Sequence, residues 1–296
     1  MSEIFKWLKK SEGDRRHDHA DVIVLPEIEN GAEASPDSSI EAESVPHARP
    51  DLECDSRFDI NAAEVSVKTV LDPISTVGEQ YRILQAKLNL LQQQRGVKRL
   101  LITSALPSEG KTFTACCLAG VLSQEKHKKV LLTDADLRMA NAWKLLGIKE
   151  VGEFKGLSHL LAGEIDAHQA LYRSSDSELY FLPAGKPALN PVELLSAPNL
   201  QRAANVWDQF DWVVVDSPPI IGLADTNLLA SFCDAIILVV LANKTPVKLV
   251  NEAIERVGRE KICGVILNRM KKLDSSRYYN YYYRQSAKQR LGVGSI

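Results

Sequence analysis

The stretch ALPSEGKT, residues 105–112, decides the fold because of what stands on either side of it. Before it lies the apolar run KRLLIT at 98–103, which has the composition of a buried strand, and after it a helix is expected from about Thr112 to Ser123. A Gly-Lys-Thr triplet between a buried strand and a helix is the context that a phosphate-binding loop requires. The sequence therefore predicts a nucleotide-binding loop at this point.

The chemistry of this loop follows from the helix that it opens. Backbone N–H groups at a helix N-terminus bind anions, so those from Ser108 to Thr112 would converge on the β- and γ-phosphates of a nucleotide. Lys111 would neutralise these phosphates, and the Thr112 hydroxyl would reach Mg²⁺. Ala105 stands where the usual pattern has its first glycine.

Strands and helices alternate outward from the loop. Continuous β-branched runs predict strands that are covered on both faces. The pattern predicts a doubly wound, mostly parallel α/β sheet of the P-loop NTPase type, with helices on both faces and right-handed crossovers, in one domain. The expected strands lie at 98–103, 128–136, 179–185, 211–219, 234–242 and 262–270, and the expected helices at 75–94, 112–123, 141–146, 191–195, 199–208, 223–231 and 246–257.

Acidic residues end two of these strands. LLTDADLR carries Asp134 and Asp136 after the second strand, and WVVVDSPP carries Asp216 after the fourth. Ligands of open α/β sheets gather at the carboxyl ends of the strands, so all three carboxylates can face one Mg²⁺-nucleotide. Any one of these aspartates could instead be an ordinary strand-end residue that caps the helix after it. Three of them beside a phosphate-binding loop favour the metal-nucleotide reading.

The N-terminal part differs in composition from the rest of the chain. Residues 11–60 carry fourteen acids and four bases, net −10, in a chain whose formal charge is −2. Such a segment cannot offset its own ordering entropy, so residues 1–65 are expected to be disordered, with a short amphipathic helix as one reading of 2–10. The domain boundaries follow as 66–272 for the P-loop domain and 273–296 for a flexible tail.

The cysteines and the hydropathy pattern indicate a cytoplasmic protein. None of the five cysteines forms a CxxC pair, and four of them sit in apolar stretches, as reduced core residues do. No run approaches the roughly 20 apolar residues that span a bilayer, and MSEIFKWLKK lacks the apolar stretch of a signal peptide. No nucleic-acid partner is expected.

The tail contains an unusual cluster, RYYNYYYRQ, at 277–285. Its neighbours are polar or charged rather than aliphatic, so the cluster does not have the pattern of a core element. An aromatic strand and a docking tail both fit the composition. The cluster consists of Tyr278, Tyr279, Tyr281, Tyr282 and Tyr283.

The motifs SALPSEGKT, VLLTDADLR and VVVDSPP, in this order, resemble the bacterial tyrosine kinases, the P-loop autokinases of capsule and exopolysaccharide export. LPAGKPALNPVELLSAP at 182–198, EQYRILQAKL at 79–88 and the tyrosine cluster extend the resemblance over roughly residues 70–285. It implies ATP-dependent autophosphorylation of the cluster, on a neighbouring subunit, as a control of polysaccharide polymerisation and export. Each phosphate would add about −1.5 to −2 charges to a basic tail.

The resemblance also implies roles for individual residues. Lys111 would hold the phosphates, and Thr112, Asp136 and Asp216 would organise Mg²⁺. Asp134 and Asp136 would divide metal contact and activation of the tyrosine hydroxyl, with Asp134 favoured for activation. Arg138 would help to neutralise the phosphate charge or would contribute to a subunit interface. The implied ATP contacts are Ser108, Glu109, Gly110, Lys111, Thr112, Phe113 and, as the adenine-reading residue, Asn268.

Assembly and partners are implied by the same family. Its assembly pattern E-x2-R-x2-R is matched by Glu79 and Arg82, whereas Gln85 replaces the second arginine. A homo-oligomer is expected. Because the chain shows no membrane segment, a separate membrane-embedded polysaccharide co-polymerase would activate the kinase and recruit it to the inner face of the membrane.

Two other classes share parts of this pattern. Partitioning and positioning ATPases carry a second lysine four residues before the loop glycine, where this chain has Leu106. Its absence and the tyrosine cluster argue against that class. The other alternative is a nucleotide-binding regulator without kinase activity, whose tail serves only for docking. The full set of Lys111, Thr112 and three aspartates argues against an inactive site.

Overall fold

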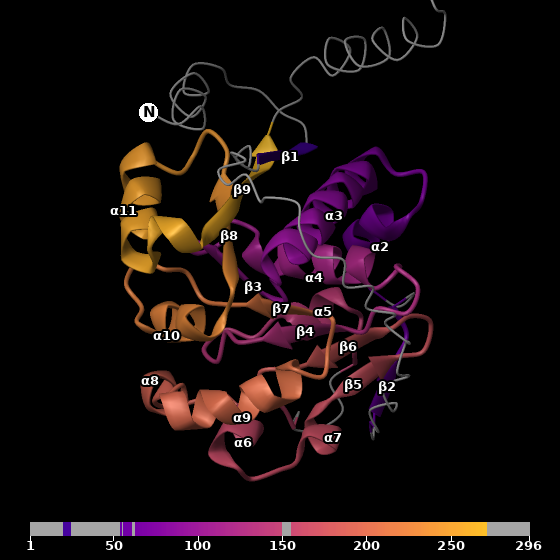
Figure 1. Ribbon diagram of the computed structural model, residues 1–296, viewed down its shortest axis with the longest axis vertical. Coiled ribbons are helices and arrows are strands. Elements are labelled where there is room, and N and C mark those ends of the chain that lie inside the picture. The colour runs from indigo at the N-terminus through magenta and orange to yellow at the C-terminus, as the bar shows by residue number, and fades with distance from the viewer. Residues whose placement is uncertain (1–19, 25–53, 55, 61–62, 150–154, 271–296) are drawn as a thin grey trace, which may run out of the picture.

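The computed structural model describes residues 20–24, 54, 56–60, 63–149 and 155–270 (Figure 1). The tyrosine cluster and the expected helix at 2–10 lie outside these residues. Among the helices that are described, none combines the length and the apolar character that crossing a membrane requires.

One nine-stranded sheet organises the fold, in the order β1-β9-β8-β3-β7-β4-β6-β5-β2. The strands from β9 to β6 in this order are mutually parallel, whereas β1 pairs antiparallel with β9, and β5 pairs antiparallel with β6. The strands are β1 Ala20–Val24, β2 Ser56–Phe58, β3 Arg99–Ser104, β4 Val130–Asp134, β5 Tyr172–Ser174, β6 Leu179–Leu182, β7 Trp212–Asp216, β8 Ala235–Leu241 and β9 Ile262–Met270.

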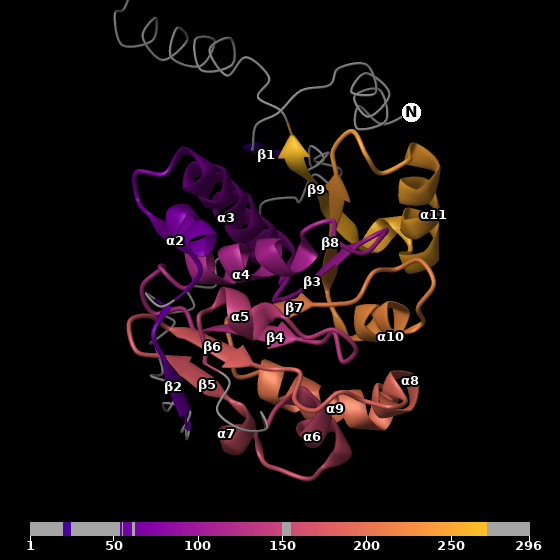
Figure 2. The same cartoon turned by 180° about the vertical axis from the view of Figure 1, so that it is seen from behind.

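Helices cover both faces of the sheet, as Figures 1 and 2 show from opposite sides. One face is covered by α2 Val65–Leu71, α3 Thr76–Arg95, α4 Lys111–Leu122 and α5 Ala142–Leu145. The other face is covered by α6 Leu157–Ala162, α7 Ala167–Ala170, α8 Pro191–Leu194, α9 Ala197–Trp207, α10 Asp225–Phe232 and α11 Val247–Val257. A 3₁₀ turn, η3 Arg259–Lys261, leads into β9.

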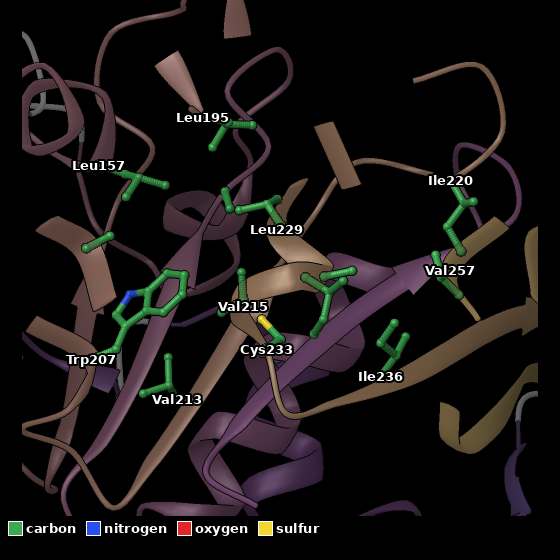
Figure 3. Packing of buried hydrophobic residues seen from close by; sticks show 14 of the residues in the cluster. Leu157, Leu195, Trp207, Val213, Val215, Ile220, Leu229, Cys233, Ile236 and Val257 are labelled. Carbon is green, nitrogen blue, oxygen red and sulfur yellow. The ribbon is translucent and has the colours of Figure 1, made fainter. Parts of the chain in front are cut away.

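The apolar runs in the central strands serve both of these layers. Along β7, Val213 and Val215 face the α9–α10 layer beside Trp207 and Leu229 (Figure 3), while Val214 belongs to the core under α3 and α4. Successive side chains of a strand point to opposite faces, so a strand buried on both faces needs no polar alternation. This explains why unbroken apolar runs identified the central strands.

The predicted fold class is confirmed, and all six expected strands and all seven expected helices are present. The structure adds α2, α6, α7 and the strand β5, whose short sequences carry little periodic signal. It also places two strands within residues 1–65, the segment whose composition predicts that it is largely disordered. Within that segment, β1 pairs with β9, and β2 pairs with β5. Both strands gain their hydrogen bonds from partners far away in the chain, which composition does not reveal.

The long helix α3 fixes one face of the sheet. Ser75 caps it by accepting a hydrogen bond from the Gly78 N–H at 3.2 Å, and Gly96 ends it with a left-handed φ of 67°. The side chains spaced for a buried stripe, Tyr81, Leu84, Leu88 and Leu91, are all buried. The packing of α3 therefore comes from one face of the helix, as its spacing predicts.

Truncation of this stripe should lower the stability of the fold. Leu88→Ala removes a fully buried side chain, and we expect a loss of about 2–5 kcal/mol in the free energy of unfolding, measured by denaturant titration. Leu90→Ala on the same helix is the control, because Leu90 is 49% exposed and its loss should cost under about 1 kcal/mol. Equal losses in the two variants would contradict this assignment of the buried face.

Candidate active site

The phosphate-binding loop has the predicted shape. Helix α4 begins at Lys111, and Gly110 before it adopts a left-handed φ of 93°. Ser108 also has a positive φ, of 63°, although it is not a glycine. Within the described part of the chain, the backbone N–H groups from Ser108 to Thr112 donate no hydrogen bond. They are thus available to an anion at the helix N-terminus.

The strand register brings the acidic residues to this loop. Strand β7 lies between β3 and β4, and its last residue, Asp216, is opposite Ile102 of β3 and opposite Asp134 of β4. Because the strands are parallel, these ends lie on the same edge of the sheet as the loop that follows β3. The three predicted aspartates and Lys111 are therefore brought together.

Asp216 is a buried carboxylate that nothing else in the described structure satisfies. It is 1% exposed, and neither of its oxygens has a hydrogen-bond partner of ordinary geometry there. Burial raises the pKa of Asp216 well above its usual value, as do the charges of Asp134 and Asp136, while Lys111 and the Thr112 hydroxyl act in the opposite direction. A buried carboxyl group whose oxygens accept no hydrogen bond is stabilised when it binds a cation or a proton.

The surrounding donor set fits Mg²⁺ bound together with a nucleotide. Carboxylate and hydroxyl oxygens are the ligands that Mg²⁺ prefers. In the described ranges no three His, Cys, Asp or Glu side chains converge closely enough to hold a metal by themselves. In phosphoryl-transfer sites Mg²⁺ is usually bound by one or two carboxylates together with the phosphate oxygens of the substrate.

Asp136 faces the lysine of the loop. Its Oδ2 lies 3.6 Å from the Nζ of Lys111, and its Oδ1 accepts hydrogen bonds from the backbone N–H groups of Arg138 and Met139. Both partners of the ion pair are largely buried, with side-chain exposures of 12% for Lys111 and 7% for Asp136. The pair holds the lysine at the mouth of the loop.

Asp134 is held by the backbone groups around it. It is fully buried, and its two oxygens accept hydrogen bonds from the backbone N–H groups of Asp136 and Ala142, at 3.2 and 3.1 Å. Burial raises the pKa of Asp134 to about 7, against the lowering effect of these bonds. Each oxygen keeps a further lone pair, and activation of the tyrosine hydroxyl by Asp134 stays a prediction.

Arg138 is exposed and forms an ion pair with a buried residue that sequence reasoning missed. Its Nε and Nη2 donate to the two oxygens of Asp225, at 2.8 and 3.2 Å, and Asp225 is 1% exposed at the start of α10. This bidentate contact raises the pKa of Arg138. Asp225 lies 87 positions after Arg138 in the sequence, so no local pattern indicates this pairing.

The remaining predicted nucleotide contacts divide into two groups. Asn268 lies against the loop, where its Nδ2 donates to the backbone carbonyl of Glu109 at 2.8 Å. The Glu109 side chain is buried and turned toward the end of β8, and Phe113 is partly buried against the core under α3 and α4. The structure thus brings Asn268 to the site but directs the side chains of Glu109 and Phe113 elsewhere.

The expected assembly residues lie on α3 and are bonded within the chain. Arg82 donates to Glu79 at 2.9 Å and to the backbone carbonyls of Pro73 and Ser75. Gln85 donates to the backbone carbonyl of Val121. The Arg82 contacts fix the turn between α2 and α3, and the Gln85 contact joins α3 to α4. A role in assembly stays a prediction.

The geometry is that of a P-loop phosphotransferase or nucleotide hydrolase. A family described as "AAA domain" matches residues 108–261. The chain is 34% identical over 220 residues to tyrosine-protein kinase YwqD of Bacillus subtilis, covering 73% of this chain and 91% of that one. It is 30% identical over 224 residues to tyrosine-protein kinase wzc of Salmonella typhimurium, covering 73% of this chain and 31% of that protein.

Among solved structures, the kinase domain of the Escherichia coli tyrosine kinase ETK is similar with a TM-score of 0.64 at 28% identity. That match covers 74% of this chain and 82% of that domain. The protein belongs to the bacterial tyrosine-protein kinases. The resemblance inferred from the motifs is confirmed, and the partitioning ATPase is not favoured.

Asp216→Asn should stabilise the nucleotide-free protein while impairing its chemistry. The raised pKa of Asp216 means that unfolding releases its proton above pH 4, so the carboxyl group destabilises the fold increasingly as the pH rises toward the folded-state pKa. We expect the variant to gain about 1–3 kcal/mol at pH 8 and less at pH 5, in urea titrations without nucleotide. A loss of stability at pH 8 would contradict the assignment.

Proposed function

We propose that the protein is an ATP-dependent tyrosine autokinase whose acceptors are Tyr278, Tyr279, Tyr281, Tyr282 and Tyr283, on a neighbouring copy. One observation carries the proposal. The partnerless carboxylate of Asp216 lies between the ends of β3 and β4, beside a loop with free N–H groups and the ammonium group of Lys111. Phosphoryl transfer requires mainly such positioning and charge neutralisation.

In this proposal the loop N–H groups and Lys111 bind the β- and γ-phosphates of ATP. Thr112, Asp136 and Asp216 would hold Mg²⁺, which supplies neutralisation of phosphate charge when bound. Lys111 is already held by Asp136, so the ammonium group needs little reorganisation to meet a phosphate. Asp134 orients Asp136 through the backbone, and we assign the contact with the reacting groups to Asp136.

Exposed apolar side chains beside the site suit the approach of tyrosine rings. Met139 follows Arg138 in the loop after β4 and is 72% exposed, and Leu189 is fully exposed. The N–H of Ala188 donates to the carbonyl of Leu137 at 3.2 Å, which ties the two segments together. We propose that Met139 and Leu189 contact the tyrosine segment, since single exposed apolar residues at a site provide apolar contact area for aromatic rings.

The polysaccharide role and the partner belong to the same proposal. We propose that the protein is cytoplasmic, assembles with copies of itself and controls exopolysaccharide or capsule export through a membrane-embedded co-polymerase that recruits it. The similarity to wzc covers only 31% of that relative, which supports the idea that other parts act with this domain. Fractionation of cells with and without the partner gene, with the kinase traced by antibody, measures the recruitment.

Lys111→Met should reduce phosphotyrosine formation by about 100-fold or more, because the charge that neutralises the phosphates is lost. The assay incubates purified protein with Mg-ATP and detects phosphotyrosine by mass spectrometry. Lys126→Met is the control, since Lys126 is an exposed lysine in the turn after α4 and should leave activity unchanged. Phosphotyrosine that persists undiminished in Lys111→Met would refute the kinase assignment.

The Lys111→Met variant also tests whether one copy of the protein phosphorylates the tail of another. Lys111→Met, whose tail is intact, is mixed with a protein in which the five tyrosines are replaced by phenylalanine. Phosphate on the Lys111→Met chain shows transfer between copies. Its absence, with an active wild type, would restrict the reaction to one chain.

Met139→Ser and Leu189→Ser should each lower the rate of tail phosphorylation by about 3- to 10-fold through loss of apolar contact. The affinity for a fluorescent ADP analogue should not change, because neither side chain belongs to the loop that binds phosphate. Val65→Ser on α2, which is 78% exposed, provides the matched control. A parallel loss of nucleotide affinity would point to disruption of the site rather than of acceptor docking.

A further inference from the structure

The phosphate-binding loop contains an acidic side chain that is turned away from the phosphates. Glu109 is 2% exposed, and its Oε2 accepts a hydrogen bond from the backbone N–H of Leu106 at 2.8 Å, which closes the turn of the loop on itself. Its Oε1 accepts from the hydroxyl of Thr245 and from the backbone N–H of Leu241 at 3.5 Å. One buried carboxylate thus joins the loop to the turn between β8 and α11.

A second contact fixes the same point of the loop. Asn268, near the end of β9, donates its Nδ2 to the carbonyl of Glu109. The approach is so close that a Cβ on Gly110 would lie 1.8 Å from that nitrogen, and Gly110 also requires a left-handed φ. The side chain and the backbone of Glu109 are therefore both bound to the ends of neighbouring strands, since Leu241 and Asn268 are register partners in β8 and β9.

The chemistry of this contact makes it sensitive to small changes. In the described part of the chain no lysine or arginine forms an ion pair with Glu109, so neutral donors alone stabilise its buried carboxylate. Hydrogen bonds to a charged acceptor are stronger than neutral ones, and removal of one leaves a buried group without its partner. Loss of the Thr245 hydroxyl should therefore alter the position of the loop rather than only weaken the fold.

We propose that Glu109 and Thr245 are positioning residues of the kinase reaction. Through this contact the phosphate-binding loop is held in its nucleotide-binding conformation against the β8 and β9 ends, on the side of β3 opposite Asp216. Neither side chain touches the reacting groups. The proposal rests on the nucleotide site of the proposed function, but it assigns these two residues to the geometry of the loop, and it removes Glu109 from the residues whose side chains contact ATP.

The test measures nucleotide affinity separately from phosphorylation. The probe is a methylanthraniloyl derivative of ADP with MgCl₂, titrated into the full-length protein, and steady-state autophosphorylation gives KM for ATP and kcat. We expect Glu109→Gln and Thr245→Val each to raise Kd and KM by about tenfold, with kcat changed less than about twofold. The double variant should be little worse than either single variant, because both changes break one contact.

Two further variants separate positioning from general damage. Thr245→Ser keeps the hydroxyl and should restore the wild-type Kd. Thr69→Val removes a hydroxyl that bonds the carbonyl of Val65 on α2, and it should leave Kd unchanged. Urea titrations of all variants report whether loss of stability accompanies the change.

Wild-type Kd and KM in both Glu109→Gln and Thr245→Val would overturn the proposal, as would failure of Thr245→Ser to restore binding. A wild-type protein that binds the probe but forms no phosphotyrosine would refute the kinase proposal. The comparison of Kd among the variants would then still test whether Glu109 and Thr245 position the loop. A wild-type protein that binds no nucleotide would refute both.

Discussion

The site depends on one energetically unfavourable feature, a carboxyl group buried at the end of β7 with no hydrogen bond to the described chain. Burial of a carboxyl group without a hydrogen-bond partner costs free energy. Asp216 is buried because its strand, β7, lies between β3 and β4. The parallel sheet, with a core on each face, stabilises the fold enough to hold Asp216 in that state. The same feature favours cation binding at the site, because a cation bound to Asp216 offsets the free-energy cost of burying this carboxylate.

The other acidic residues of the region are distinguished from Asp216 by their hydrogen bonds. Asp134 binds two backbone N–H groups, Asp225 binds the guanidinium of Arg138, and Glu109 binds the loop and Thr245. These three carboxylates fix loops, whereas Asp216 remains free to act on a ligand. The phosphate-binding loop is thus held on both sides of β3, by the Lys111–Asp136 pair on one side and by the β8 and β9 ends on the other.

The sequence predicted what depends on local pattern. Apolar runs located the six parallel strands, and the Gly-Lys-Thr triplet with the strand-end aspartates located the site, because parallel strands bring their carboxyl ends to one edge. Contacts between distant residues were not predictable. Glu109 with Thr245, and Arg138 with Asp225, pair residues 136 and 87 positions apart, and neither residue of a pair carries a local signal for the other. The edge strands β1 and β2 were missed for the same reason.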